Sequence, residues 1–151
     1  MSSDDPAALA REVIDSNRYM TLGTADEEGR PWVSPVWFAQ SNYREFFWIS
    51  SPNARHSQNL AARPELAIAI FDSQVPPFGA KAVYMSASAE QLADDELTRG
   101  IEVFTRKSEA DGAGMLSLAD IQEPAKHRLY RAVASEHFVL SQNDERIPVD
   151  P

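Results

Sequence analysis

Short aromatic and β-branched segments separated by turn residues are the feature of this sequence that most constrains its fold. Segment 19–24 alternates polar and apolar side chains, and segment 32–38 is rich in aromatic and β-branched residues. Between them, residues 26–29 have the composition of a hairpin turn, with a glycine that can adopt positive φ. A third such segment, 45–49, follows a second turn. The pattern predicts antiparallel strands joined by hairpins.

Helix signals are fewer. Asp5-Pro6 predicts a helix ending near Asn17, because a capping acid precedes a proline at the first helical position. Ser51-Pro52 predicts a second helix, running to about Ala62, for the same reason. A third is expected over the amphipathic segment 94–107. The remaining expectations are a strand at 66–71 buried on both faces, a loop at 72–80, a strand at 82–91, a polar loop at 108–114, a short helix near 118–121, and a final strand or bent hairpin at 128–133 and 136–140.

This order of elements predicts a mainly β fold, a barrel with helical additions. The sequence contains no internal repeat and no domain boundary, and a length of 151 residues suits a single domain over 1–151. Residues 1–5 and 141–151 are expected to form loosely ordered tails.

Composition excludes several classes of function. The chain has no cysteine, which excludes disulfides, thiolate metal sites and cysteine nucleophiles. Its N-terminal residues lack the basic and apolar regions of a signal peptide, and no apolar run approaches the roughly 20 residues of a membrane span. The formal net charge of -9 disfavours binding to nucleic acid or to anionic membranes. We therefore expect a soluble, cytoplasmic protein that binds neither nucleic acid nor membranes.

The strongest candidate site is the segment Ser50 to Leu60. Hydroxyls at a strand end (Ser50 and Ser51) precede a helix that carries Arg55 and His56 in its opening turns. Free N–H groups at a helix N-terminus and a bidentate guanidinium both favour phosphate. The alternative interpretation is a well-capped helix with a solvated arginine.

Pro35 interrupts the aromatic strand at 32–38. Proline cannot donate to a β-ladder, so this strand is expected at an edge or a bulge. Its exposed backbone, over Val33, Ser34, Pro35 and Val36, could meet the edge of a heteroaromatic ring. The alternative is ordinary core next to an edge strand.

Other polar residues carry no recognisable motif. His56, His127 and His137 do not have metal-ligand spacing, so no metal site is predicted. No Ser/His/Asp set has a motif context, and no catalytic residue is assigned. The basic residues at 128–131 and the acid and histidine at 136–137 are expected on the outward face of a terminal strand.

Taken together, several segments resemble the pyridoxamine 5′-phosphate oxidase-like family, the flavin- and deazaflavin-binding split β-barrels. The resemblance covers about 13–92, with a looser return at 128–140. It rests on the order and spacing of Tyr19-Met20-Thr21-Leu22-Gly23-Thr24, Gly29-Arg30-Pro31, Val33-Ser34-Pro35-Val36-Trp37-Phe38, Phe47-Trp48-Ile49-Ser50, Arg55-His56, Asn59-Leu60 and Pro64-Glu65-Leu66-Ala67.

The resemblance implies a six-stranded antiparallel split β-barrel with flanking helices, forming a two-fold homodimer with cofactor sites in the interface. It implies that Ser50, Arg55 and His56 hold the cofactor phosphate, and Ser51 and Asn59 are also expected to contact the cofactor. The ring would meet the backbone of Val33 to Val36. The partner subunit would add Lys81, Tyr84 and His137.

The chain departs from the oxidase itself at two positions of the phosphate segment. The oxidase carries Arg then Lys where this chain has Arg55-His56, and serine where it has Ala54. The expected function is therefore an FMN-binding oxidoreductase with an unassigned substrate, and not pyridoxamine 5′-phosphate oxidation. The alternatives are a deazaflavin-dependent reductase and a non-catalytic flavin- or haem-binding module.

The two cofactors differ in charge, because the deazaflavin coenzyme continues past its phosphate into an acidic tail. Few cations follow Arg55 and His56: Arg63, then Lys81, in a chain of net charge -9. This favours FMN, unless a partner subunit brings Lys126, Arg128 and Arg131 to the same opening.

Overall fold

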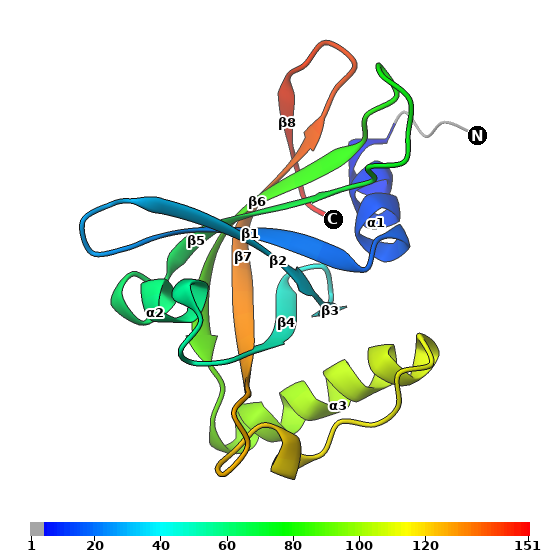
Figure 1. Cartoon of the computed structure of the whole chain (residues 1–151). Helices are drawn as coiled ribbons and strands as arrows, with labels where there is room; N and C mark the ends of the chain where they lie inside the picture. The colour runs from blue at the N-terminus through cyan, green and yellow to red at the C-terminus, as the bar shows by residue number, and fades with distance from the viewer. Residues whose placement is uncertain (1–4) are drawn as a thin grey trace.

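A computed structural model describes residues 5–151 of the chain, in which eight strands form one antiparallel sheet in the order β2-β1-β5-β6-β7-β4-β3, with β8 paired to β7 (Figure 1). The sheet curls into a half-barrel. The strands are β1 (Tyr19–Ala25), β2 (Pro31–Trp37), β3 (Ala39–Ser41), β4 (Glu45–Ser50), β5 (Glu65–Phe71), β6 (Ala82–Gln91), β7 (Arg128–Leu140) and β8 (Arg146–Val149). The helices are α1 (Pro6–Ser16), α2 (Arg55–Ala62), α3 (Asp94–Ala110) and a 3-10 turn, η1 (Leu118–Asp120).

The concave face of the sheet holds the main core. Alternate residues of the strands point inward, so that large apolar side chains gather there and small or polar ones remain outside. α1 covers one end of this core with Val13 and Ile14. The largest core side chains, each almost fully buried, are Met20, Leu22, Phe38, Phe46, Trp48, Ile68 and Ile70.

α3 closes a second, smaller core on the other face of β4 and β7. Phe47, Leu129 and Phe104 are buried there. The helix lies so close to the strands that a Cβ at Gly100 would stand 2.7 Å from Leu92 Cδ1. An alanine at this position would require the ends of the Leu92 and Leu129 side chains to shift.

Ion pairs anchor α3 at the edge of this second core. Arg131 of β7 pairs with Glu90 at 2.6 Å, with Glu45 at 3.1 Å and with Glu96 of α3. Arg99 of α3 also pairs with Glu45. Because Arg131 and Glu45 are both mostly buried, the pair between them is shielded from solvent more than an ordinary surface pair.

The sequence prediction of a mainly β split barrel with flanking helices is confirmed, but the number of strands is wrong. The sheet has eight strands where six were expected, because the short β3 and β8 also pair. β8 also corrects the expected C-terminal tail, since residues 146–149 lie on β7 and are not loosely ordered. At the other end Asp5 caps α1, and residues 1–4 lie outside the described residues.

One local expectation, a final strand over 128–140, is confirmed, and two others differ from the structure. Residues 128–140 form one strand, β7, which absorbs an irregularity in its pairing opposite Ser86 and Ala87. α2 begins at Arg55, because residues 51–54 form a turn closed by Ala54 N–H on the Ser51 carbonyl. β5 is buried on one face only, with alanines at 67 and 69 on the other.

None of the helices within residues 5–151 is long and apolar enough to cross a membrane.

Candidate functional site: a polar corner and an apolar trough joined by an edge strand

The corner between the end of β4 and the start of α2 contains a buried Ser–His pair. The His56 Nε2 and Ser50 Oγ atoms are 2.8 Å apart, and both side chains are buried. Burial lowers the pKa of His56 below its ordinary value of 6.5, so the imidazole is neutral at neutral pH. A neutral imidazole and a hydroxyl can exchange donor and acceptor roles, but they bring no positive charge to the corner.

The positive charge of the corner comes from Arg55. Its guanidinium lies over the Trp32 ring of β2, 4.2 Å from the ring centroid, which holds an exposed side chain in one place. Within residues 5–151 it forms no ion pair with a carboxylate, unlike Arg30, Arg44, Arg99 and Arg131. Arg55 is therefore free to pair with an anion from outside the chain.

Arg55 is also the first residue of α2, whose N-terminus has no side-chain cap among the described residues. The first N–H groups of a helix have no intrahelical acceptor, and the helix dipole adds partial positive charge there. The Ser51 hydroxyl does not cap the helix, because it accepts from Asn53 N–H at 3.1 Å. Donors and a guanidinium therefore converge at the start of α2.

Asn59, also predicted to contact the cofactor, is a buried link between α2 and the sheet. Its Nδ2 donates to Thr24 Oγ1 of β1 at 3.0 Å. This bond fixes the helix over β1 and thereby fixes the direction in which its N-terminus points.

β2 is an edge strand, as Pro35 predicts. Within residues 5–151 it pairs with β1 alone, with Val33 opposite Gly23 and Pro35 opposite Thr21. Val33 and Pro35 are exposed on the outer face of the sheet, whereas Ser34 and Val36 turn toward the core. The backbone of the edge facing away from β1 is open to a ligand.

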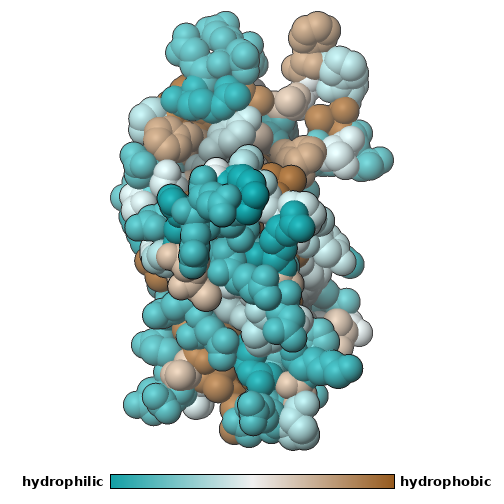
Figure 2. Space-filling view, turned by 60° about the vertical axis from the view of Figure 1, so that its left-hand side comes forward, coloured by the Kyte–Doolittle hydropathy of each residue, from teal (hydrophilic) through white to brown (hydrophobic). Residues whose placement is uncertain are grey.

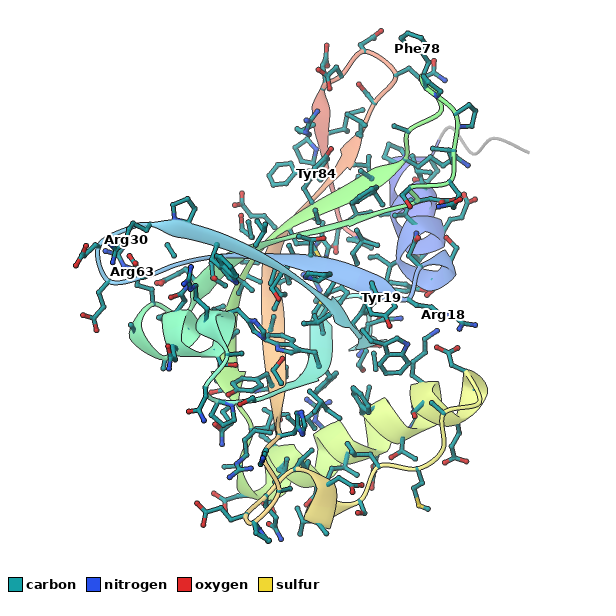
Figure 3. The ribbon with its side chains drawn as sticks, in the orientation of Figure 1. Arg18, Tyr19, Arg30, Arg63, Phe78 and Tyr84 are labelled. Atoms are coloured by element: carbon teal, nitrogen blue, oxygen red, sulfur yellow. The ribbon has the colours of Figure 1, made fainter. Side chains whose placement is uncertain are left out.

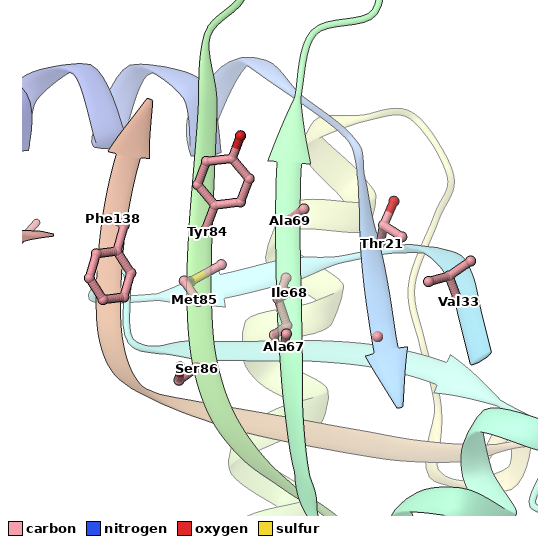
Figure 4. Close-up of a pocket in the computed structure, with 10 residues that line it drawn as sticks. Thr21, Val33, Ala67, Ile68, Ala69, Tyr84, Met85, Ser86 and Phe138 are labelled. Carbon is pink, nitrogen blue, oxygen red and sulfur yellow. The ribbon is translucent and has the colours of Figure 1, made fainter. Parts of the chain in front are cut away.

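An apolar trough of about 300 Å³ lies on the outer face of the sheet beside Val33 (Figure 4). None of the ten lining residues is charged, and small side chains form much of the lining. Larger side chains, Tyr84 and Phe138, stand at one end and Val33 at the other (Figure 4). The lining residues are Thr21, Gly23, Val33, Ala67, Ile68, Ala69, Tyr84, Met85, Ser86 and Phe138.

The β1–β2 hairpin carries acidic side chains. Figure 2, turned to bring this side of the molecule forward, shows a mainly hydrophilic surface. A depression of about 280 Å³ there is lined by Asp26, Glu27, Glu28 and Arg30, with Gln58, Asn59 and Ala62. Hydrogen bonds from Arg30 hold the pKa of Asp26 below its ordinary value, so this surface stays negative and repels phosphate. An anionic ligand is therefore directed to the Arg55 side of α2.

A family model described as pyridoxamine 5′-phosphate oxidase matches residues 7–138. This chain belongs to that family.

Solved structures of similar fold include proteins named for different ligands, haem in some and FAD in another. A haem-binding protein from Mycobacterium smegmatis has a TM-score of 0.76 at 20% identity, covering 99% of this chain and 59% of its own. The haem storage protein HutZ from Vibrio cholerae has a TM-score of 0.66 at 25% identity, covering 85% of this chain and 90% of its own. An FAD-binding protein from Mesorhizobium loti has a TM-score of 0.66 at 20% identity, covering 88% and 92%. No curated protein matches the sequence.

Three residues predicted to act from a partner subunit occupy different surroundings in this family member. Lys81 is exposed and lies 3.6 Å from Glu12 of α1. Tyr84 lines the trough, and Arg146 stands over its ring at 4.6 Å. His137 is buried, with Nε2 2.6 Å from the Tyr43 carbonyl oxygen, while its neighbour Phe138 reaches the trough.

The family member thus brings together Ser50, Arg55 and His56 at one corner and places Val33 at the rim of the trough. The sequence prediction missed Trp32 as the support for Arg55, and it missed most of the trough. Small residues at 67 and 69, alternating with Leu66, Ile68 and Ile70, were the available signal for an outer face of small side chains. Among residues 5–151, no group of three or more histidines and acids is arranged to hold a metal ion.

Proposed function

We propose that this member of the pyridoxamine 5′-phosphate oxidase family is an FMN-binding oxidoreductase that works as a homodimer on a small-molecule substrate. The observation that carries the proposal is Arg55, a guanidinium without a carboxylate partner among the described residues, at the uncapped start of α2 and stacked on Trp32. A phosphate monoester is the anion that matches a fork of N–H donors beside a helix N-terminus.

The remaining residues of the corner fit this group. Ser50 and His56 add a hydroxyl and an imidazole that are already fixed by their mutual hydrogen bond. The open backbone of Val33 to Val36 would orient the ring by hydrogen bonds. Bound FMN supplies the redox chemistry, and the protein supplies position and electrostatics. No side chain of the corner needs to carry a proton during hydride transfer.

The homodimer is proposed from the outer face of the sheet. Besides the uncharged trough, this face exposes Tyr19, Val33 and Phe71. Exposed apolar side chains that lie together on one face are typical of a protein–protein interface. Two chains of charge -9 repel each other, so self-association is favoured where carboxylates are absent, as they are from the trough lining. We expect an interface above about 2,000 Å², as in obligate dimers.

FMN is preferred over the deazaflavin coenzyme because the cations near the corner are occupied. Arg63 Nη2 donates to the Glu27 carbonyl at 2.8 Å. Arg131 is held by Glu45, Glu90 and Glu96, and Arg128 Nη1 donates to backbone carbonyls of 125 and 127. An acidic tail extending past the phosphate would meet few free cations.

The test is Arg55→Ala with FMN titration. Loss of the charge-assisted hydrogen bonds should weaken FMN binding by about 1.5–3 kcal/mol. The melting temperature of the cofactor-free protein should barely change, because Arg55 is exposed. Arg63→Ala is the matched control and should leave FMN affinity close to wild type. Equal losses in both variants, or no FMN binding by the wild-type protein, would refute the proposal.

A haem-binding module is the second candidate, favoured by the likeness to HutZ at 25% identity and by an uncharged trough. Parallel titrations separate the two functions. FMN fluorescence quenched on binding, with no sharpened haem absorption when haemin is added, supports the flavoprotein. The opposite pattern supports the haem module.

A further inference from the structure

Phe78 is a fully exposed aromatic side chain at the tip of the loop 72–81 between β5 and β6 (Figure 3). Its backbone is left-handed, with φ of +69°, a conformation that bulky residues rarely adopt. The turn is closed by Gly79 N–H on the Pro76 carbonyl at 3.0 Å, and Pro77 precedes Phe78. The loop therefore holds an aromatic ring in solvent at a conformational cost, and the ring is not buried by any of the described residues.

The strand registers place this loop and α2 at opposite ends of the sheet. Phe71 pairs with Ala82 at the loop end. Glu65, which follows α2, pairs with Ser88 toward the other end, and the β1–β2 hairpin lies at that end too. Figure 3 accordingly shows Phe78 far from Arg30 and Arg63.

Two copies packed through their outer faces are related by a two-fold axis lying between those faces. If the axis runs across the strands, the strands of the two copies are antiparallel. The loop 72–81 of each copy then lies over the α2 end of the other. If the axis runs along the strands, the two loops meet at the same end.

The distribution of charge favours the antiparallel arrangement. The hairpin end carries Asp26, Glu27, Glu28 and Glu65, against Arg30 and Arg63. Residues 73–80 of the loop contain no charged side chain. Antiparallel packing seats this neutral loop over the acidic end of the partner and separates the two acidic ends, which would repel each other if they lay side by side.

We propose that each subunit's loop 72–81 crosses to the partner and that Phe78 packs at the Val33 end of the partner's trough, beside the β2 edge. This rests on the dimer proposed above and adds the residue that completes the site. Phe78 would wall the space next to the open backbone of β2 and exclude water from a ring bound there. Its exposure and its positive φ in the single chain are then explained by its role in the partner.

The absence of cysteine from the chain permits a direct test by cross-linking. Phe78→Cys and Ala25→Cys are made singly and together. Ala25 ends β1 at the hairpin, six residues from Tyr19 at the loop end, or about 20 Å along the strand, so a short bismaleimide cannot join the two positions within one chain. The double variant, and a mixture of the two single variants after subunit exchange, should give a covalent dimer. Each single variant alone should not.

Light scattering of the uncross-linked variants keeps this proposal separate from the dimer itself. A monomer mass of 16.8 kDa refutes the proposed dimer. A dimer in which Phe78→Cys cross-links to itself shows that the loops meet at one end, and a dimer with no product from the double variant shows that Phe78 does not reach the trough. Either result overturns the proposal and leaves the dimer standing. As a second measurement, Phe78→Ser should raise the dimer dissociation constant at least tenfold, whereas Gln74→Ser in the same loop should not change it.

Discussion

The α2 corner and the outer-face trough adjoin the same strand, β2, yet differ in how complete they are in one chain. In the corner, Ser50, His56, Asn59 and Trp32 all have partners within the chain. In the trough, lining side chains such as Val33 and Ala67 are exposed on the outer face of the sheet. The corner is thus organised within a single chain, whereas the trough would be completed only by the partner subunit proposed above. The contrast suggests that folding of a single chain forms the proposed anion site, and that formation of the proposed dimer completes the space for the flavin ring.

The largest expected effect comes from placing a charge in the trough. Ala67→Glu puts two carboxylates into a face-to-face interface, where a buried unpaired charge is strongly unfavourable. We expect dimer affinity to fall at least 100-fold, about 2.8 kcal/mol, as measured by sedimentation equilibrium. Ala61→Glu, on the exposed surface of α2, is the control with the same charge change. Retention of the dimer by Ala67→Glu would show that the outer face is not the interface.

A smaller effect is expected from cutting the link between α2 and β1. Asn59→Ala removes a buried hydrogen bond to Thr24 and should lower the unfolding free energy of the cofactor-free protein by about 1–3 kcal/mol. Gln58→Ala, one residue earlier and exposed, should stay within about 0.5 kcal/mol of wild type. Urea denaturation measures both. Equal unfolding free energies for the two variants would mean that the hydrogen bond between Asn59 and Thr24 does not organise the corner within a single chain.

The smallest effect is a pH dependence of stability. Burial lowers the pKa of His56 and of His137, so the unfolded chain takes up protons near pH 6.5 while the folded protein resists them. Unfolding free energy should therefore be fully retained above about pH 6.5 and should fall as the pH drops below it. His56→Gln should lessen this fall between pH 7.5 and 5.5 in urea titrations. His127→Gln replaces an exposed histidine, and the same reduction in that variant would contradict the assignment to His56.

The sequence predicted the positions of the strands and helices better than it predicted which face of each strand is buried. Turn residues at 26–29 and the proline at 35 specify a hairpin and an edge strand locally, and both are confirmed. The apolar run 66–71 was wrongly predicted to be buried on both faces, because the alanines at 67 and 69 are compatible with a buried or an exposed face and their alternation with larger side chains was not used. β8 was missed since its pairing depends on β7, which is close in sequence but is not signalled by any local pattern.

The candidate site shows the same division. Ser50, Arg55 and His56 are close in sequence, so that a local motif identified the corner that the structure assembles. The trough combines residues from β1, β2, β5, β6 and β7, and no local pattern reports which of these strands become neighbours. Trp32 was predicted only as an aromatic residue of a strand. Its contact with Arg55 was missed because it joins two elements, β2 and α2, that are separated in sequence by β3 and β4.

The prolines on the free margins of the sheet bear on how the protein behaves when concentrated. β2 carries Pro31 and Pro35, β8 carries Pro148, and β3 is only three residues long. A strand that lacks N–H groups at intervals, or that is very short, is a poor template for further strands. Sheets from different molecules therefore cannot readily join side by side into fibrils, even though the outer face carries an apolar trough. In the proposed dimer, self-association would then be confined to the outer face of the sheet, which favours a closed pair over an open-ended polymer.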